Sequence, residues 1–312
     1  MSAGRRSTAW SLAGRLAVSL TLLWLVSRYV DVGGVRQRLS ELSPGWVALG
    51  LAISVLQVGV LAWRWRYTAG RLGIDLPLRE AVGEYYLGIL LNQVLPGGVT
   101  GDVSRAWRHA RTDAPTGPAV RAVILERASA QLVMVPVAIV SVLLLPGASG
   151  ASRMTAAAAM VVLTGLVVAA LARRQASDFH AGRFWADARQ ALGARQALAP
   201  QLASALLVVA SYIGVFLVAA RAVSSETSIA IMLPLVAPVL MTMLIPVTVA
   251  GWGIREAAAT ALWGAAGLTP EDGAAISVAY GLLVLVSSAP GLVVLMRVLI
   301  GDRGRRAHPP PA

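Results

Sequence analysis

The sequence predicts an all-α polytopic membrane protein, with about six full membrane spans and two Pro/Gly-broken re-entrant hairpins in two halves of inverted topology. The first observation is composition: hydrophobic residues make up 57% of the 312 residues and charged residues only 13%, far from the balance of a soluble domain. The second is that apolar stretches of about 20 residues, the length of a transmembrane helix, recur along the chain. The third is a duplication. The motif LPGGVTGDVSR at 95–105 returns as IPVTVAGWGIR at 245–255, so that Pro96, Gly101 and Arg105 reappear 150 positions later.

The expected elements follow from the apolar stretches, taken in chain order. The stretches long enough for full spans are 12–27, 45–63, 131–145, 154–172, 201–220 and 274–299. Shorter or broken apolar stretches lie at 81–95, 229–250 and 254–267. We expect one integral membrane domain over 1–312, with halves at approximately 10–150 and 151–300 and a basic, Pro-rich disordered tail at 301–312.

The repeated motif breaks a helix in apolar surroundings in both halves. Proline removes a helical hydrogen bond, and glycine relaxes the backbone. Non-helical backbone at membrane depth is tolerated only where protein covers it or where it lines a polar cavity. Paired interruptions in corresponding halves therefore indicate a transporter-type binding site. The alternative is that both motifs are ordinary connections between full spans.

The charge distribution predicts the orientation. All 27 basic residues are arginine, and arginine-rich loops are retained in the cytoplasm. We expect an uncleaved first span, both termini in the cytoplasm and a multi-pass protein of the cytoplasmic membrane. If 85–95 crossed fully, the arginines at 105–121 would lie outside, so we expect this segment to dip in and return. The second hairpin, followed by the acidic turn GLTPEDG, is expected to open from the outside. Arg28, Arg36 and Arg38 in the first external loop are exceptions.

The composition also narrows the chemistry. The chain has no cysteine and three scattered histidines, which rules out thiolate chemistry and gives no metal-ligand spacing. The net charge of +12 lacks the interleaved aromatic and basic patches of a nucleic-acid surface. We therefore expect no cofactor, no metal and no nucleic-acid partner.

The first motif predicts an anion-binding helix start. After Gly97, Gly98 and Gly101, Asp102 is placed to N-cap a returning half-helix, with Arg105 one turn further on. Free N–H groups at a helix start attract anions, and the guanidinium adds a fork that suits phosphate.

The second motif, broken at Pro246, predicts a matching tip. Gly251 and Gly253 precede Arg255 and Glu256, so an arginine and a carboxylate again share a first turn. Two such tips meeting at the midplane would form a pocket for an anionic head group, because charge inside a bilayer is expensive and marks function. The alternative is that each arginine only neutralises its neighbouring carboxylate.

Four more polar residues are site candidates. Glu126 and Arg127 are adjacent at the start of an apolar run. Glu126 either pairs with an arginine of a hairpin tip or marks an interfacial helix start. Asn92 and Thr242 are 150 positions apart, each four residues before the motif proline. They either coordinate a head group or hydrogen-bond the broken helix.

The segment WRWRY at 63–67 alternates aromatic and basic residues. Tryptophan, tyrosine and arginine are enriched where helices cross the membrane interface. We interpret this segment as an interfacial belt and not as a site.

These motifs resemble one family. The segments NQVLPGGVTGDVSRAW (92–107), the ER pair at 126–127 and IPVTVAGWGIRE (245–256), followed by Pro290-Gly291, are similar to the transmembrane region of lysylphosphatidylglycerol synthases. This flippase-like integral membrane family occurs alone or fused to other domains, and the likeness extends over roughly 12–300. It implies an inner-membrane protein that translocates lipids, such as aminoacylated phosphatidylglycerol. The soluble aminoacyltransferase domain of the full synthases is not in this sequence, so we expect no synthase activity.

Three functions are compatible with these observations. The leading hypothesis is a lipid translocase that moves a phospholipid or a lipid-linked head group, with membrane lipids as its partners. An alternative is an accessory subunit for a separately encoded synthase or glycosyltransferase. The third is an intramembrane lipid transferase with Asp102 or Glu126 as base, although the sequence offers no Ser-His or metal partner for it.

Overall fold

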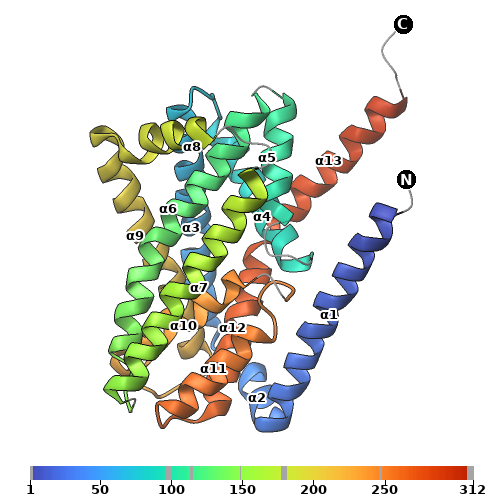
Figure 1. The fold of residues 1–312 in the computed structure, drawn as a ribbon. Coiled ribbons are helices and arrows are strands. Elements are labelled where there is room, and N and C mark those ends of the chain that lie inside the picture. Colours follow the sequence, from blue (N-terminus) through green and yellow to red (C-terminus); the bar gives the residue numbers. More distant parts are fainter. Residues whose placement is uncertain are drawn as a thin grey trace, which may run out of the picture.

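The computed structural model describes residues 3–95, 100–112, 115–147, 149–176, 181–245 and 248–307, and these residues form a helical bundle without strands (Figure 1). The helices of the first half are α1 (Ala3–Tyr29), α2 (Val32–Ser40), α3 (Pro44–Arg71), α4 (Leu78–Val94), α5 (Thr100–Thr112), α6 (Thr116–Leu143) and α7 (Gly150–Ala176). Those of the second half are α8 (Ala181–Ala188), the π-helical turn η1 (Arg189–Gly193), α9 (Arg195–Ala222), α10 (Ile229–Met241), the 3₁₀ turn η2 (Thr242–Leu244), α11 (Ile254–Ala265), α12 (Pro270–Ser287) and α13 (Pro290–Ala307).

Several of these helices suit a membrane span. Among the described residues, α3, α6, α9 and α12 are long and apolar enough to cross a bilayer. The apolar part of α1 with α2 makes a fifth candidate, bent by 100° at the junction. An all-α, multi-pass membrane protein is therefore confirmed, with four or five candidate spans by length and composition.

Two of the expected boundaries differ in the structure. The span expected at 274–299 is two helices, because α12 ends at Ser287 and α13 begins at Pro290. Proline lacks the N–H that a continuing helix needs but fits the first helical position. α13 then packs along α4, and it continues to Ala307, inside the tail expected to be disordered. Residues 308–312 lie outside the described part.

Both repeated motifs coincide with helix breaks. The chain leaves α4 after Val94 and resumes helix at Thr100, while η2 ends at Leu244 and α11 begins at Ile254. On either side of each break the helices pack against each other: α4 against α5, and α10 with η2 against α11. Pro96, Gly97, Gly98 and Pro246 lie outside the described residues, so the breaks are defined by the helix ends around them.

Four successive helices of the first half have counterparts in the second. α3 and α9 have 28 residues each and begin 151 positions apart (195−44), while α5 and α11 begin 154 apart (254−100). α6 and α12 also begin 154 positions apart (270−116). The order α3–α4–α5–α6 therefore repeats as α9–α10–α11–α12.

The first helices of the two series, α3 and α9, lie side by side and run antiparallel. Gln57 Nε2 donates to Ser211 Oγ at 2.7 Å, and Arg71 Nη2 donates to the Gln190 carbonyl at 3.2 Å. The Ser43 N–H donates to the Ala222 carbonyl at 3.0 Å, beyond the other end of α3. As residue numbers rise along α3, those of their partners fall.

Candidate functional site

The α4–α5 hairpin is closed by two small residues. A Cβ on Gly101 would stand 1.9 Å from the Gly88 carbonyl oxygen, so the two backbones touch. Asn92 Oδ1 accepts the Gly101 N–H at 2.7 Å. Of the two roles open to Asn92, it therefore hydrogen-bonds the broken helix. α5 begins at Thr100, which puts Asp102 inside the first turn; the expectation that Asp102 is the N-cap is wrong.

Arg105 is the centre of the first half. Its side chain is fully buried, and its Cζ lies 4.7 Å from the ring centre of Trp65 and 4.2 Å from that of Tyr85. Its Nε donates to Asp102 Oδ1 at 3.0 Å and its Nη2 to Glu126 Oε2 at 2.9 Å. One guanidinium thus links a carboxylate of its own helix to a carboxylate of α6.

Glu126 lies in the interior of α6, with no solvent exposure. Since α6 begins ten residues earlier, at Thr116, Glu126 does not mark a helix start. Its partner is an arginine of the hairpin tip, which was the other possibility. Its Oε2 also accepts the Tyr85 hydroxyl at 2.5 Å. Arg127, its neighbour, turns to Asp102 Oδ1, donating from Nε at 3.1 Å and from Nη2 at 2.9 Å.

Arg64 completes the first cluster, which we define as Arg64, Asp102, Arg105, Glu126 and Arg127. The interpretation of 63–67 as a belt is wrong for Arg64 and Trp65, both of which are fully buried. Arg64 Nη1 donates to Ser204 Oγ at 2.7 Å, and Nη2 to Ser129 Oγ at 2.7 Å. Its Nε stands 3.9 Å from Glu126 Oε1. Alternating letters do not reveal which face of a helix is buried, so sequence reasoning missed this residue.

The second break has a different local structure. Gly251 and Gly253 have φ of +80° and +89°, a region that favours glycine. Glu256, at the third helical position of α11, accepts the Gly253 N–H at 2.7 Å, so its carboxylate satisfies one orphan donor of the helix start. A Cβ on Gly253 would stand 2.8 Å from the Ser19 carbonyl, because α1 packs on this tip.

We define the second cluster as Trp252, Arg255, Glu256, Ser277 and Tyr280. Arg255 is fully buried; its Nη2 donates to Glu256 Oε1 at 2.6 Å and its Nε to Ser277 Oγ at 2.9 Å. Its Cζ lies 5.0 Å from the ring centre of Trp252 and 5.2 Å from that of Tyr280. An arginine between two rings and bonded to a carboxylate is therefore common to both clusters.

Thr242 has a local role. Its Oγ1 donates to the Val239 carbonyl, one turn back, at 2.7 Å. Like Asn92, it hydrogen-bonds the broken helix, and coordination of a head group by either residue stays a prediction.

The two arginine tips belong to separate packed clusters, with Tyr212 of α9 as a link between them. Tyr212 packs against both buried hydrophobic clusters of the bundle, the one that contains Tyr85 beside Arg105 and the one that contains Tyr280 beside Arg255. The expectation of an open polar pocket where the tips meet stays a prediction, since both arginines are buried among protein groups.

The buried charges leave identifiable hydrogen-bonding capacity. Within the described residues, Arg105 Nη1 and Arg255 Nη1 have no hydrogen-bond partner, nor do Arg64 Nε and Glu126 Oε1. The first cluster holds three cations and two anions, a net charge of +1 (3−2). Arg64 and Arg105 are fully buried, whereas 34% of the Arg127 side chain is exposed. The net positive charge around the two buried guanidinium groups favours one further anion. Asp102 accepts hydrogen bonds from Arg105 and Arg127, and Glu126 accepts them from Arg105 and Tyr85, so both carboxylates are already engaged by side chains of the protein.

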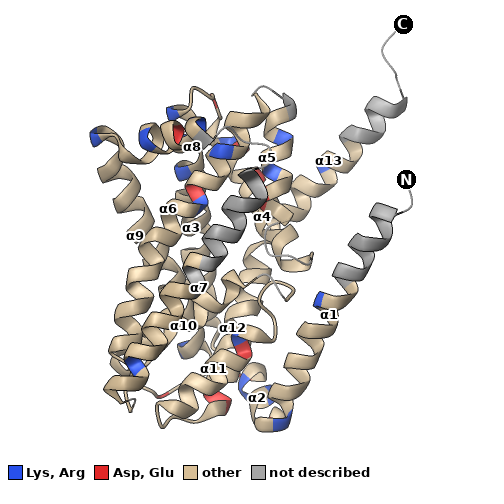
Figure 2. Cartoon of the chain, in the orientation of Figure 1, with Lys and Arg blue, Asp and Glu red and all other residues tan. Residues whose placement is uncertain are grey.

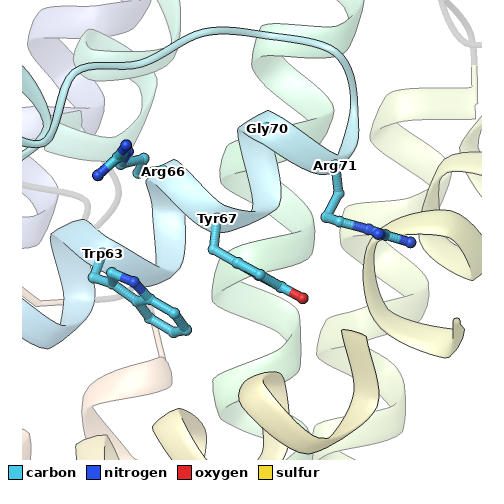
Figure 3. A pocket seen from close by; sticks show the side chains of 5 residues that line it. All are labelled: Trp63, Arg66, Tyr67, Gly70 and Arg71. Carbon is cyan, nitrogen blue, oxygen red and sulfur yellow. The ribbon is translucent and has the colours of Figure 1, made fainter. Parts of the chain in front are cut away.

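A shallow pocket of about 400 Å³ lies apart from these clusters, at the end of α3. Figure 3 shows its lining residues, which are Trp63, Arg66, Tyr67, Gly70 and Arg71. The rings of Trp63 and Tyr67 stack with their centres 5.2 Å apart, and Arg71 donates a hydrogen bond to the Gln190 carbonyl of η1. The pocket is open, and its aromatic and basic lining fits the interfacial belt expected for this segment.

Comparison with known families identifies the chain's relatives. Residues 12–291 match the family described as lysylphosphatidylglycerol synthase TM region. The match covers both helix breaks and both clusters, and it confirms the resemblance drawn from the motifs. A search of curated proteins found no match.

Proposed function

Because the chain belongs to the lysylphosphatidylglycerol synthase transmembrane family, we propose that it is a lipid translocase that moves a phospholipid or lipid-linked head group across the membrane. A lipid-related role in the membrane follows from the family. The translocation step is our proposal, and the anionic nature of the head group is part of it.

The observation that carries the proposal is the uncompensated charge of the first cluster. Three guanidinium groups, two of them fully buried, face two carboxylates, and among the described residues Arg105 Nη1 has no hydrogen-bond partner. A phosphodiester would supply the missing charge, and arginine binds phosphate through paired N–H donors. The second cluster repeats the unpartnered Nη1 on Arg255, 150 positions further on.

We further propose that the two halves are inverted repeats, with about six full spans and two re-entrant hairpins. The repeated helix order and the antiparallel pairing of α3 with α9 support this arrangement. Inverted repeats place substrate near the midplane, at broken helices. Both breaks would then approach the same depth from opposite faces.

The proposed location is the cytoplasmic membrane, with both termini in the cytoplasm. Figure 2 shows basic residues gathered around α5 and α8. The start of α1 and the end of α13 lie at that same end of the bundle in Figure 1. The positive-inside rule then assigns this end to the cytoplasm.

A reconstituted flipping assay tests the function. Purified protein in liposomes would receive acyl-NBD-phosphatidylglycerol or zwitterionic acyl-NBD-phosphatidylcholine, and dithionite quenching would report the label reaching the outer leaflet. We expect protein-dependent movement of the phosphatidylglycerol probe, reduced in Arg255→Ala and unchanged in Arg36→Ala, which alters an exposed arginine.

The other outcomes distinguish the alternatives. Wild-type liposomes in which neither probe moves would overturn translocation by the chain alone. Copurification of a synthase or glycosyltransferase would then favour the accessory subunit. A change in the mass of the recovered lipid would favour the transferase.

A further inference from the structure

Glu126 has two carboxylate oxygens in different surroundings. Its Oε2 accepts hydrogen bonds from Arg105 Nη2 and from the Tyr85 hydroxyl. Among the described residues its Oε1 has no hydrogen-bond partner; Arg64 Nε, which also has none, lies 3.9 Å from it. A hydrogen bond between nitrogen and oxygen forms at about 2.7–3.2 Å, so a shift of under about 1 Å would join the two atoms.

From this geometry we infer that Arg64 is a positioning residue. When an anionic head group binds Arg105 and breaks its hydrogen bond to Glu126, Arg64 becomes the cationic partner of Glu126. The inference rests on the proposed function and identifies the Arg64 guanidinium as the group that allows Arg105 to leave Glu126 and bind the head group. Arg64 does not touch the lipid; it acts through Glu126.

The exchange addresses a problem of buried charge. If a phosphate drew Arg105 away from Glu126, the carboxylate would keep only the Tyr85 hydroxyl and would lie uncompensated in a buried site. A bare buried carboxylate is strongly unfavourable. With Arg64 already beside Oε1, Glu126 keeps a cationic partner in both states, and lipid binding does not have to overcome that loss.

Arg64 is held in place for this role. Its terminal nitrogens donate to Ser129 Oγ on α6 and to Ser204 Oγ and the Gln201 carbonyl on α9. These bonds occupy Nη1 and Nη2 and leave Nε, 3.9 Å from Glu126 Oε1, without a hydrogen bond among the described residues. A guanidinium fixed by two other helices stays where it is while Arg105, on the short helix α5, changes partner.

The repeat provides an independent comparison. The residue 151 positions after Arg64, by the offset of α3 and α9, is Val215, which is also buried. Among the described residues, the second cluster pairs one arginine with one carboxylate and has no second arginine at the corresponding place. The extra arginine, and with it the net positive charge, therefore belongs to the first half alone.

The test measures how flipping depends on lipid. Wild type, Arg64→Gln, Glu126→Gln and the double variant are reconstituted at increasing mole fractions of phosphatidylglycerol, with acyl-NBD-phosphatidylglycerol as the probe. The maximal rate, the half-saturating mole fraction and the membrane level are recorded. We expect Arg64→Gln to raise the half-saturating fraction at least about tenfold. Glu126→Gln should lower it, because Arg105 is then available without exchange.

The double variant separates positioning from simple packing. With no carboxylate at 126 there is nothing for Arg64 to compensate, so Arg64→Gln/Glu126→Gln should return the half-saturating fraction to within about threefold of wild type. A residue that mattered only through its bonds to Ser129, Gln201 and Ser204 would not be rescued in this way. If Arg64→Gln does not accumulate, the single variant Glu126→Gln and the double variant carry the comparison.

The results that overturn the inference are distinct from those that overturn the function. A wild-type protein that moves phosphatidylglycerol, with the same half-saturating fraction in Arg64→Gln or no rescue in the double variant, overturns the role of Arg64 alone. A wild-type protein whose rate does not respond to phosphatidylglycerol overturns the proposed function, and this inference with it.

Discussion

Gly101 and Gly88 bring the backbones of α5 and α4 into direct contact, since a Cβ on Gly101 would stand 1.9 Å from the Gly88 carbonyl oxygen. Backbone atoms cannot rotate away as a side chain can. This contact sets the distance at which the two arms of the hairpin lie, and thereby the position of Arg105 one turn further along α5.

Gly101→Ala should therefore destabilise the protein. Overpacking a tight contact costs about 1–3 kcal/mol, and here the obstacle is backbone. We expect a lower midpoint in a thermal unfolding experiment followed by size-exclusion chromatography in detergent. Gly59→Ala on α3, where an added Cβ meets nothing within 4 Å, is the matched control and should change the midpoint little. Equal midpoints for both variants would contradict the hairpin contact.

Substitution of Gly281 of α12 should affect flipping more than stability. A Cβ there would stand 2.3 Å from Arg255 Nη2 and 2.7 Å from the Trp252 ring. Both obstacles are side-chain ends that can move, so we expect Gly281→Ala to keep its membrane level but to displace Arg255. Flipping of NBD-phosphatidylglycerol should fall, while Gly264→Ala, with only an ordinary contact at 3.5 Å, should retain it. Wild-type flipping in Gly281→Ala would argue against a role for the position of Arg255.

Arg105→Lys tests the shape of the cation. Arg105 uses separate nitrogens for Asp102 and Glu126, and a lysine ammonium is a point charge that cannot reproduce this fork. We expect flipping to fall roughly tenfold or more, together with some loss of membrane level, because the structural pairing also needs the fork. Arg36→Lys, at an exposed position, is the control. Undiminished flipping in Arg105→Lys would exclude bidentate recognition by this residue.

Single cysteines test the proposed topology, and the absence of native cysteine means that each reports only itself. The exposed positions Thr116 and Gly193 are expected in the cytoplasm, and Gly150 and Thr269 outside. An impermeant maleimide applied to intact cells should label only the second pair. Labelling of Thr116→Cys from outside would show that the α4–α5 segment crosses the membrane fully.

The helix breaks were predictable from sequence because proline, glycine and arginine recur at one offset in an apolar background. The pairing of Glu126 with an arginine of the tip was also among the predicted possibilities, since a carboxylate in an apolar run needs a cation. The burial of Arg64 was not predictable, because its neighbours Trp63, Arg66 and Tyr67 do form the surface that the WRWRY pattern indicates. Within these five residues, Arg64 and Trp65 face the interior of the bundle, and the other three line the open pocket.

Capping was also beyond the sequence. Asp102 has the right chemistry for an N-cap, yet α5 begins two residues earlier, at Thr100, and the Gly101 N–H of its first turn donates to Asn92, nine residues earlier on the opposite arm. Such a contact depends on how closely the arms approach, which Gly88 and Gly101 decide together. The division between α12 and α13 was missed because the apolar stretches on both sides of Ser287-Ser288-Ala289-Pro290 are long enough together to read as one span.

The antiparallel pairing of α3 with α9 has a consequence for how the chain is made. The Gln201 carbonyl that accepts from Arg64 lies 137 residues downstream. At about 5–20 residues per second, α3 leaves the ribosome roughly 7–27 s before its partner. During that interval Gln57 and Arg64 have no α9 to bond with, and polar groups in hydrocarbon need partners. The first half is therefore made before the α9 partners of Gln57 and Arg64 exist, and the arrival of α9 completes these hydrogen bonds.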